Sequence, residues 1–160
     1  MRATLLPVIT MGKKHVTEEN KEDTIKQSEK VDQAVKKDVK VKSSEKVTEG
    51  RVYVSSSYNN TIVTLTNSRG QVLSSKSAGA VGFKGAKKAT SFAASRVAEA
   101  IVNICKKLAV EKIEVFIKGV GAGRESAVRT LVNQGLNVVS IKDVTPIPHN
   151  GVRPKKVRRV

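Results

Sequence analysis

The chain has very few of the residues from which metal and catalytic sites are usually built. Its 160 residues include no tryptophan, one cysteine (Cys105) and two histidines, His15 and His149. A single cysteine excludes a disulfide framework and a cysteine zinc cluster. The two histidines lie far apart in the sequence, which argues against a site built from both. We therefore expect no metal and no cofactor, and we expect Cys105, within a helical apolar pattern, to lie in the core.

Acidic residues are also scarce after residue 50. Residues 51–160 hold nineteen Lys and Arg against five acids, a net charge of +14, whereas residues 1–50 hold eleven against nine. Two-metal nucleases need several converging carboxylates, and the first expected strand supplies none. We predict no catalytic residue and no enzymatic activity. Glu111 and Glu114 are expected to be solvated, and Asp143 to cap or pair at a strand end.

Long hydrophobic runs are missing as well. No apolar stretch approaches the about 18 residues of a membrane span. A membrane-surface helix would show large apolar anchors, whereas tryptophan is absent here and the basic residues lie in loops and the tail as much as on helices. A small domain with a net charge of +14 repels itself and requires a polyanionic partner. We expect that partner to be nucleic acid, with no membrane and no small-molecule substrate.

Residues 1–50 differ in composition from the rest of the chain. Their Lys, Glu, Val, Ser and Thr residues show no sustained apolar stripe and no aromatic. This composition predicts a disordered extension. Met11 is a plausible alternative start to Met1.

The remainder predicts an α/β domain over residues 51–144. Strands are expected at 51–57, 60–67, 71–77, 112–118 and 136–144, because β-rich runs alternate with turn residues. Helices are expected at 86–109 and about 123–134, the first from the apolar spacing of Val97, Ile101, Ile104 and Leu108. Gly135 would end the second helix. The order β-β-β-α-β-α-β predicts a mixed five-stranded sheet with two packed helices.

Two glycine-rich loops are candidate contact sites. In residues 78–85, Phe83 either stacks on a base or sugar or packs inward as a plug. Lys84, Lys87 and Lys88 would hold a phosphate at the start of the first helix, or would simply be solvated. In residues 119–124, Arg124 stands where a dinucleotide fingerprint has its third glycine, so nucleotide cofactor binding is disfavoured. That loop is either a structural turn or a nucleic-acid backbone contact.

The last sixteen residues form an extended basic tail, 145–160. Three of the four prolines of the chain lie in it, which excludes a continuous helix or a central strand. Five cations and no acid follow the Asn150-Gly151 turn. Such a segment suits binding along a polyanion, although a solvated terminus is the simpler alternative.

The motifs together resemble a known family. They are Ser57-Tyr58-Asn59-Asn60-Thr61, Ser77-Ala78-Gly79, Gly82-Phe83-Lys84-Gly85, Lys118-Gly119-x-Gly121-x-Gly123-Arg124-Glu125 and the run from Asp143 to Pro154. Over residues 51–160 the chain resembles the bacterial-type eleventh protein of the small ribosomal subunit. Val120, Val152 and Val157 depart from that family's pattern.

The resemblance implies a ribonuclease-H-like fold without ribonuclease activity, and a cytoplasmic, ribosome-bound protein. It implies binding to 16S-type ribosomal RNA on the subunit platform, where several RNA helices meet near the messenger (Shine–Dalgarno) cleft. Implied neighbours are platform proteins seven and eighteen, and initiation factor three. A non-ribosomal RNA-binding protein or RNA chaperone is the alternative.

The candidate RNA-contacting residues come from the turns, loops, helices and tail described above. They are Tyr58, Asn59, Asn60, Arg69, Lys76, Phe83, Lys84, Lys87, Lys88, Gly119, Gly121, Gly123, Arg124, Arg129, His149, Asn150, Arg153, Lys155, Lys156, Arg158 and Arg159.

Overall fold

The computed structural model describes residues 29, 33, 47–153 and 155–157. Residues 1–28, 30–32 and 34–46 of the predicted disordered extension, including the alternative start at Met11, therefore fall outside the described residues, as do the tail cations Arg158 and Arg159. The elements are β1 (Glu49–Ser56), β2 (Thr61–Asn67), β3 (Val72–Ser77), the 3-10 helix η1 (Gly85–Ala89), α2 (Ser91–Lys107), β4 (Lys112–Lys118), α3 (Gly123–Asn133) and β5 (Asn137–Asp143).

The strands form one mixed sheet in the order β3-β2-β1-β4-β5. β2 is antiparallel to both β1 and β3, whereas β4 is parallel to both β1 and β5. The predicted five-stranded mixed sheet with two α-helices is therefore confirmed. Strand β1 begins two residues earlier than expected, at Glu49.

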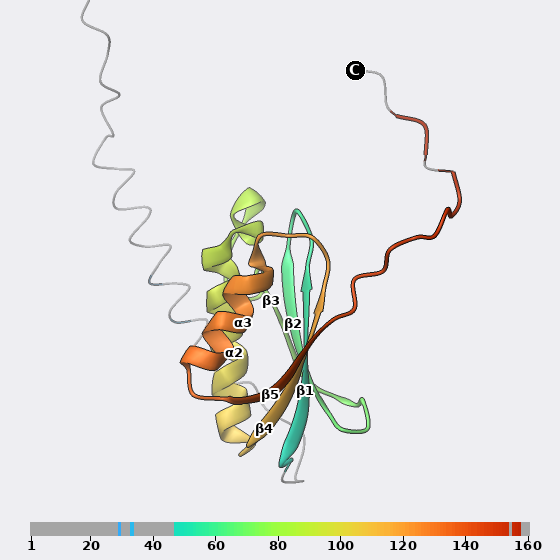
Figure 1. The fold of residues 1–160 in the computed structure, drawn as a ribbon. Coiled ribbons are helices and arrows are strands. Elements are labelled where there is room, and N and C mark those ends of the chain that lie inside the picture. Colours follow the sequence, from blue (N-terminus) through green and yellow to red (C-terminus); the bar gives the residue numbers. More distant parts are fainter. Residues whose placement is uncertain (1–28, 30–32, 34–46, 154, 158–160) are drawn as a thin grey trace, which may run out of the picture.

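Both α-helices cover the same face of the sheet (Figure 1). Val52, Val54, Val63 and Leu65 point into that side and are fully buried. The predicted apolar stripe of α2 meets them, and its four residues are all buried. Cys105 lies in this core as predicted, and burial raises the pKa of its thiol to about 12. Among the described residues, no helix covers the opposite sheet face (Figure 1).

The expected single helix over 86–109 is wrong in one respect, because it is broken at Thr90. Thr90 has extended backbone angles (φ −72°, ψ 152°), and its side-chain Oγ1 accepts a hydrogen bond from the Ala93 N–H at 3.2 Å. This is an N-cap, so α2 starts at Ser91. Lys84, Lys87 and Lys88 consequently belong to η1 and the residue before it, not to the first turn of α2.

The topology brings three connecting loops and the start of the tail to one end of the sheet. β1, β4 and β5 run parallel, so their carboxyl ends lie together. The antiparallel pairing places the start of β2 and the end of β3 there too. We call this the loop end, formed by residues 57–60, 78–84, 119–122 and the start of the tail at Val144 (Figure 1).

Candidate nucleic-acid interface

Residues 119–123, which we call the glycine loop, pack directly on the end of β1. Gly119 has a φ of +103°, and a Cβ there would overlap the backbone oxygen of Ser56. A Cβ on Gly121 would overlap the Ser57 carbonyl oxygen, and one on Gly123 would overlap Thr61 Oγ1. The Gly121 N–H donates to the Ser56 carbonyl at 3.0 Å. All three glycines are thus required by contacts within the chain, which agrees with the structural-turn alternative.

Arg124 links this loop to the root of the tail. Its Nη1 donates to the Gly119 carbonyl at 2.8 Å, and its Nη2 pairs with the Asp143 carboxylate. Asp143 Oδ1 also accepts from the Thr145 N–H at 2.9 Å and the Thr145 hydroxyl at 2.6 Å. The Thr145 hydroxyl oxygen in turn accepts from the Gly119 N–H at 3.1 Å. We call these four residues the tail latch.

The tail latch gives Asp143 the pairing role predicted for it. Hydrogen bonds from Thr145, and secondarily the Arg124 guanidinium, lower the pKa of the Asp143 carboxyl to about 2. Asp143 is therefore ionised at neutral pH, and the guanidinium of Arg124 already has two partners inside the chain.

The turn between β1 and β2 presents Tyr58 to solvent. The Ser57 N–H donates to the Asn60 carbonyl at 2.9 Å, and the Asn60 N–H donates to Ser57 Oγ at 3.1 Å. These bonds close the turn, leaving Tyr58 77% exposed and Asn59 exposed. Asn60 is half-buried, and its Oδ1 is buried without a hydrogen-bond partner in the described part of the chain. Tyr58 and Asn59 are therefore the accessible members of this predicted group.

Phe83 is half-buried and packs towards the core, which fits the plug alternative better than stacking on a base. It lies against the hydrophobic core, and its ring meets that of Phe92 edge-on at a centroid distance of 5.9 Å. Phe92 is 58% exposed, with the guanidinium of Arg96 5.3 Å from its ring centroid. Phe92 was not identified as a candidate from the sequence. Its position off the apolar stripe of α2 was the signal that its ring would be exposed.

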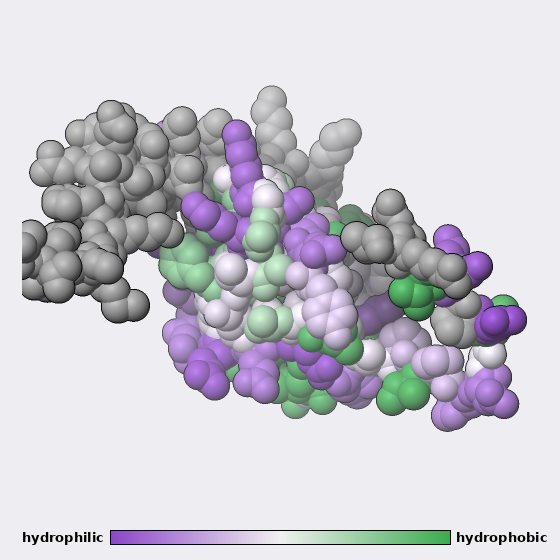
Figure 2. Space-filling model, turned by 90° about the horizontal axis from the view of Figure 1, so that it is seen from above, coloured by the Kyte–Doolittle hydropathy of each residue, from purple (hydrophilic) through white to green (hydrophobic). Residues whose placement is uncertain are grey.

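The predicted cations of the α/β domain do not all lie together. Lys76, at the end of β3, and the three lysines around η1 (Lys84, Lys87, Lys88) lie near the loop end, as does Arg124. Figure 2 views this end and shows hydrophilic residues over much of it, mixed with smaller hydrophobic areas. Arg129 is exposed further along α3. Arg69 lies in the turn between β2 and β3, at the opposite end of the sheet, so the structure does not bring it to the others.

The tail leaves the loop end and extends away from the sheet (Figure 1). Its described residues carry no helix or strand, in line with the sequence prediction. His149, Asn150, Arg153, Lys155 and Lys156 are all exposed. Asn150 has a φ of +51° next to Gly151, which marks the predicted turn.

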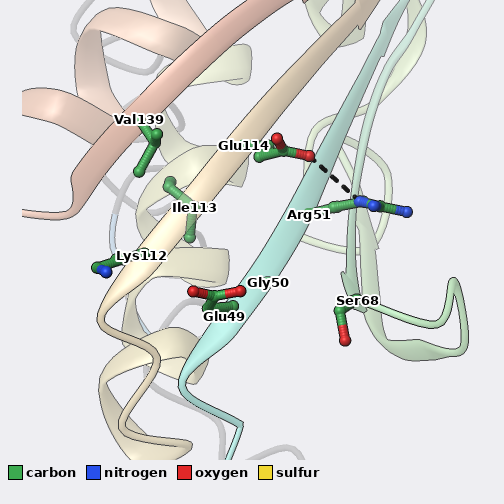
Figure 3. Close-up of a pocket in the computed structure, with 8 residues that line it drawn as sticks. All are labelled: Glu49, Gly50, Arg51, Ser68, Lys112, Ile113, Glu114 and Val139. Atoms are coloured by element: carbon green, nitrogen blue, oxygen red, sulfur yellow. Dashed lines mark hydrogen bonds and ion pairs between the residues drawn. The ribbon is translucent and has the colours of Figure 1, made fainter.

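One pocket of about 410 Å³ lies at the other end of the sheet (Figure 3). Arg51 and Glu114 meet across its wall, with Nε and Oε2 3.3 Å apart. Glu114 also pairs with Lys142 at 3.8 Å, so the expectation that Glu114 is simply solvated is wrong. The pocket is lined by Glu49, Gly50, Arg51, Ser68, Lys112, Ile113, Glu114 and Val139.

The described residues contain no cluster of three or more His, Cys, Asp or Glu side chains able to hold a metal ion. Among those same residues, none of the helices is long and apolar enough to cross a membrane.

Comparison with known proteins gives a consistent result. Residues 50–159 match the family model described as ribosomal protein S11. A small ribosomal subunit protein uS11 from Treponema pallidum (strain Nichols) is 52% identical over 121 residues, covering 76% of this chain and 96% of that protein. The uS11c protein of Chlorella vulgaris is 50% identical over 126 residues (79% and 97%), and uS11 of Borreliella burgdorferi (strain ZS7) is 50% identical over 121 residues (76% and 93%).

Proposed function

The chain belongs to the ribosomal protein S11 family, a family of structural, non-enzymatic proteins, and we propose that it is a constituent of the small ribosomal subunit that binds 16S-type ribosomal RNA. The observation that carries this proposal is the convergence of the loops and the basic tail at one end of the sheet. Cations there neutralise phosphates and hold the protein on the RNA backbone.

The finer assignment is part of the same proposal. We place the protein on the subunit platform, where it bridges several RNA helices near the messenger cleft. Proteins seven and eighteen of the small subunit and initiation factor three are the proposed neighbours, and the cytoplasm, or an organelle with its own ribosomes, is the proposed location. We also propose the ribonuclease-H-like designation for the fold, supported by the strand order β3-β2-β1-β4-β5.

The two parts of the interface have different tasks in this proposal. The loop end is a rigid surface, because its loops are hydrogen-bonded to strand ends: Gly121 to Ser56 of β1 and Ala78 to Thr61 of β2. The tail follows an RNA strand and becomes ordered on it. Arg124 acts here as a positioning residue that sets the direction in which the tail leaves, since its guanidinium is held by Gly119 and Asp143.

The test compares the full chain with a chain that ends at residue 144. Each is titrated with a platform RNA fragment and with an unrelated folded RNA over a salt series. The full chain should prefer the platform fragment. The tail carries five cations, Arg153, Lys155, Lys156, Arg158 and Arg159. Its removal should reduce the log–log salt slope by roughly 3–5. Equal affinity for both RNAs would contradict specific ribosomal binding, and an unchanged slope would contradict the role of the tail.

A further inference from the structure

The sheet face opposite α2 and α3 (Figure 1) holds an aromatic pair that is separate from the loop end. Tyr53 on β1 and Phe116 on β4 are direct partners in the parallel register. Their rings stack with centroids 5.0 Å apart and planes 15° apart. Neighbouring strands lie about 4.8 Å apart, so the two rings stand side by side over their strands instead of lying flat on the sheet.

A row of side chains crosses the sheet through this pair. Lys142 on β5 is the register partner of Phe116, and its Nζ lies 5.5 Å from the Phe116 ring centroid. On the other side, Thr64 on β2 is the partner of Tyr53 and is hydrogen-bonded to Ser75 on β3, with the hydroxyl oxygens 3.1 Å apart. The cation thus covers the outer face of Phe116. The ring face of Tyr53 that points away from Phe116 lies towards the short hydroxyl side chains of Thr64 and Ser75, and Tyr53 is 37% exposed.

The charge around this row favours a polyanion. Glu114 lies two residues before Phe116 on β4, and its two carboxylate oxygens are paired with Arg51 at 3.3 Å and Lys142 at 3.8 Å. Lys118, two register positions beyond Phe116 and therefore on the same face, is exposed. Exposed aliphatic surface on the central strands of this face is small, with Ile62 39% exposed. Protein interfaces usually have a more apolar centre.

We propose that this open face, defined by Arg51, Tyr53, Thr64, Glu114, Phe116 and Lys142, binds an unpaired stretch of RNA. One base stacks on the outer face of Tyr53 above Thr64, and extends the row of rings by one. The flanking phosphates lie near Arg51 and Lys118. The inference rests on the proposed RNA-binding function and adds a second contact surface, separate from the loop end.

The chain offers a direct spectroscopic test of this stacking. It contains no tryptophan and two tyrosines, Tyr53 and Tyr58. In a full-length Tyr58→Phe variant, Tyr53 is the single tyrosine emitter, and a base stacked on it should quench its fluorescence. The probes are a short single-stranded oligoadenylate and an adenine–uracil duplex with the same absorbance, each carrying a label whose anisotropy reports binding. We expect quenching with the single strand and little with the duplex.

Affinity gives a second, independent measurement. Tyr53→Leu removes the aromatic face and keeps an apolar side chain, whereas Tyr53→Phe keeps the ring. Tyr53→Leu should weaken single-strand binding about 10-fold and leave duplex binding unchanged, because one stacked base is lost. Tyr53→Phe should bind like the parent protein. Thermal unfolding of all variants shows whether the leucine variant remains folded at the temperature of the titration.

The outcomes separate this inference from the function it rests on. Binding reported by anisotropy without quenching of Tyr53 would overturn the inference, leave RNA binding through the loop end intact, and assign the open face to a protein partner. Equal quenching by single strand and duplex would also overturn it. Failure of every RNA to bind at low salt would overturn the proposed function and this inference together.

Discussion

The guanidinium of Arg124, at the start of α3, pairs with the carboxylate of Asp143, at the end of β5, nineteen residues away. The pair closes the tail latch beneath the first residues of the tail, because both partners also bond to Gly119 or Thr145. Arg124 therefore connects the glycine loop to the tail, and its effect on RNA binding should pass through the tail.

This role predicts a specific result in a double-mutant experiment. Arg124→Gln should weaken RNA binding by about 3- to 10-fold in the full chain, because a misdirected tail loses contacts. In a chain ending at residue 144 the same substitution should have almost no effect. The measurement is RNA affinity of the four proteins over a salt series. A loss that persists without the tail, with a salt slope reduced by about one, would show that Arg124 itself contacts a phosphate.

The pKa of Asp143 predicts how the latch responds to acid. The folded-state pKa is lowered to about 2, below the usual value of about 3.9. A lowered acid pKa contributes stability that is fully present above the unfolded pKa and is lost as pH falls through the folded pKa. The difference in urea midpoint between the parent protein and Asp143→Asn should thus be constant above about pH 5 and shrink between about pH 4 and pH 2.

Glu111→Gln is the control for that titration, since Glu111 is exposed and lies outside the latch. Its difference from the parent should not follow the same pH dependence. A difference between parent and Asp143→Asn that grows on acidification would contradict the role given to the carboxylate.

The glycine loop predicts unequal costs for two glycine substitutions. Gly70 has a φ of +85° and open space where a Cβ would lie, so Gly70→Ala isolates the backbone penalty, about 1 kcal/mol. Gly119 has a φ of +103° and would also overlap Ser56, so Gly119→Ala should cost about 1–3 kcal/mol more. Urea denaturation measures both costs. Equal costs would mean that the end of β1 shifts to make room for a Cβ at position 119.

The buried thiol predicts slow chemical modification. Cys105 is fully buried, and its pKa is raised to about 12. Only the thiolate reacts with alkylating reagents, so labelling at pH 8 should require unfolding and its rate should increase with urea in parallel with the unfolded population. A free-cysteine peptide is the control. Rapid labelling of the folded protein would show that α2 opens locally.

Stability should also depend on alkaline pH through the same group. The folded state retains the thiol proton above the unfolded pKa of about 8.5. The contribution is therefore present below that pH and is lost as pH rises towards the folded pKa of about 12. Cys105→Ala should remove this dependence, which can be followed by urea denaturation between about pH 8 and pH 10.

Several features of this protein could be determined from the amino-acid sequence alone because they depend on neighbours along the chain. The apolar spacing of Val97 to Leu108 predicts a helix and its buried face, and Gly135, with a φ of +84°, ends α3 as predicted. The excess of cations and the proline content of the tail are also local properties. The break at Thr90 could have been predicted, because threonine is a common N-cap. It was missed because Ala86 and Ala89 before it are compatible with a helix that starts earlier.

Other features were decided by the tertiary structure. Arg124 was a candidate RNA contact, and the parallel arrangement of β4 and β5 also gives it Asp143 as a partner within the chain. The glycines of residues 119–123 face Ser56, Ser57 and Thr61, which no spacing rule connects to them. Tyr53 stacks on Phe116 because β1 and β4 pair side by side in the sheet, although β2, β3 and α2 lie between them in the sequence. Register is a long-range relation set by core packing, so periodicity along the chain predicts which face a residue occupies but not which residue lies beside it.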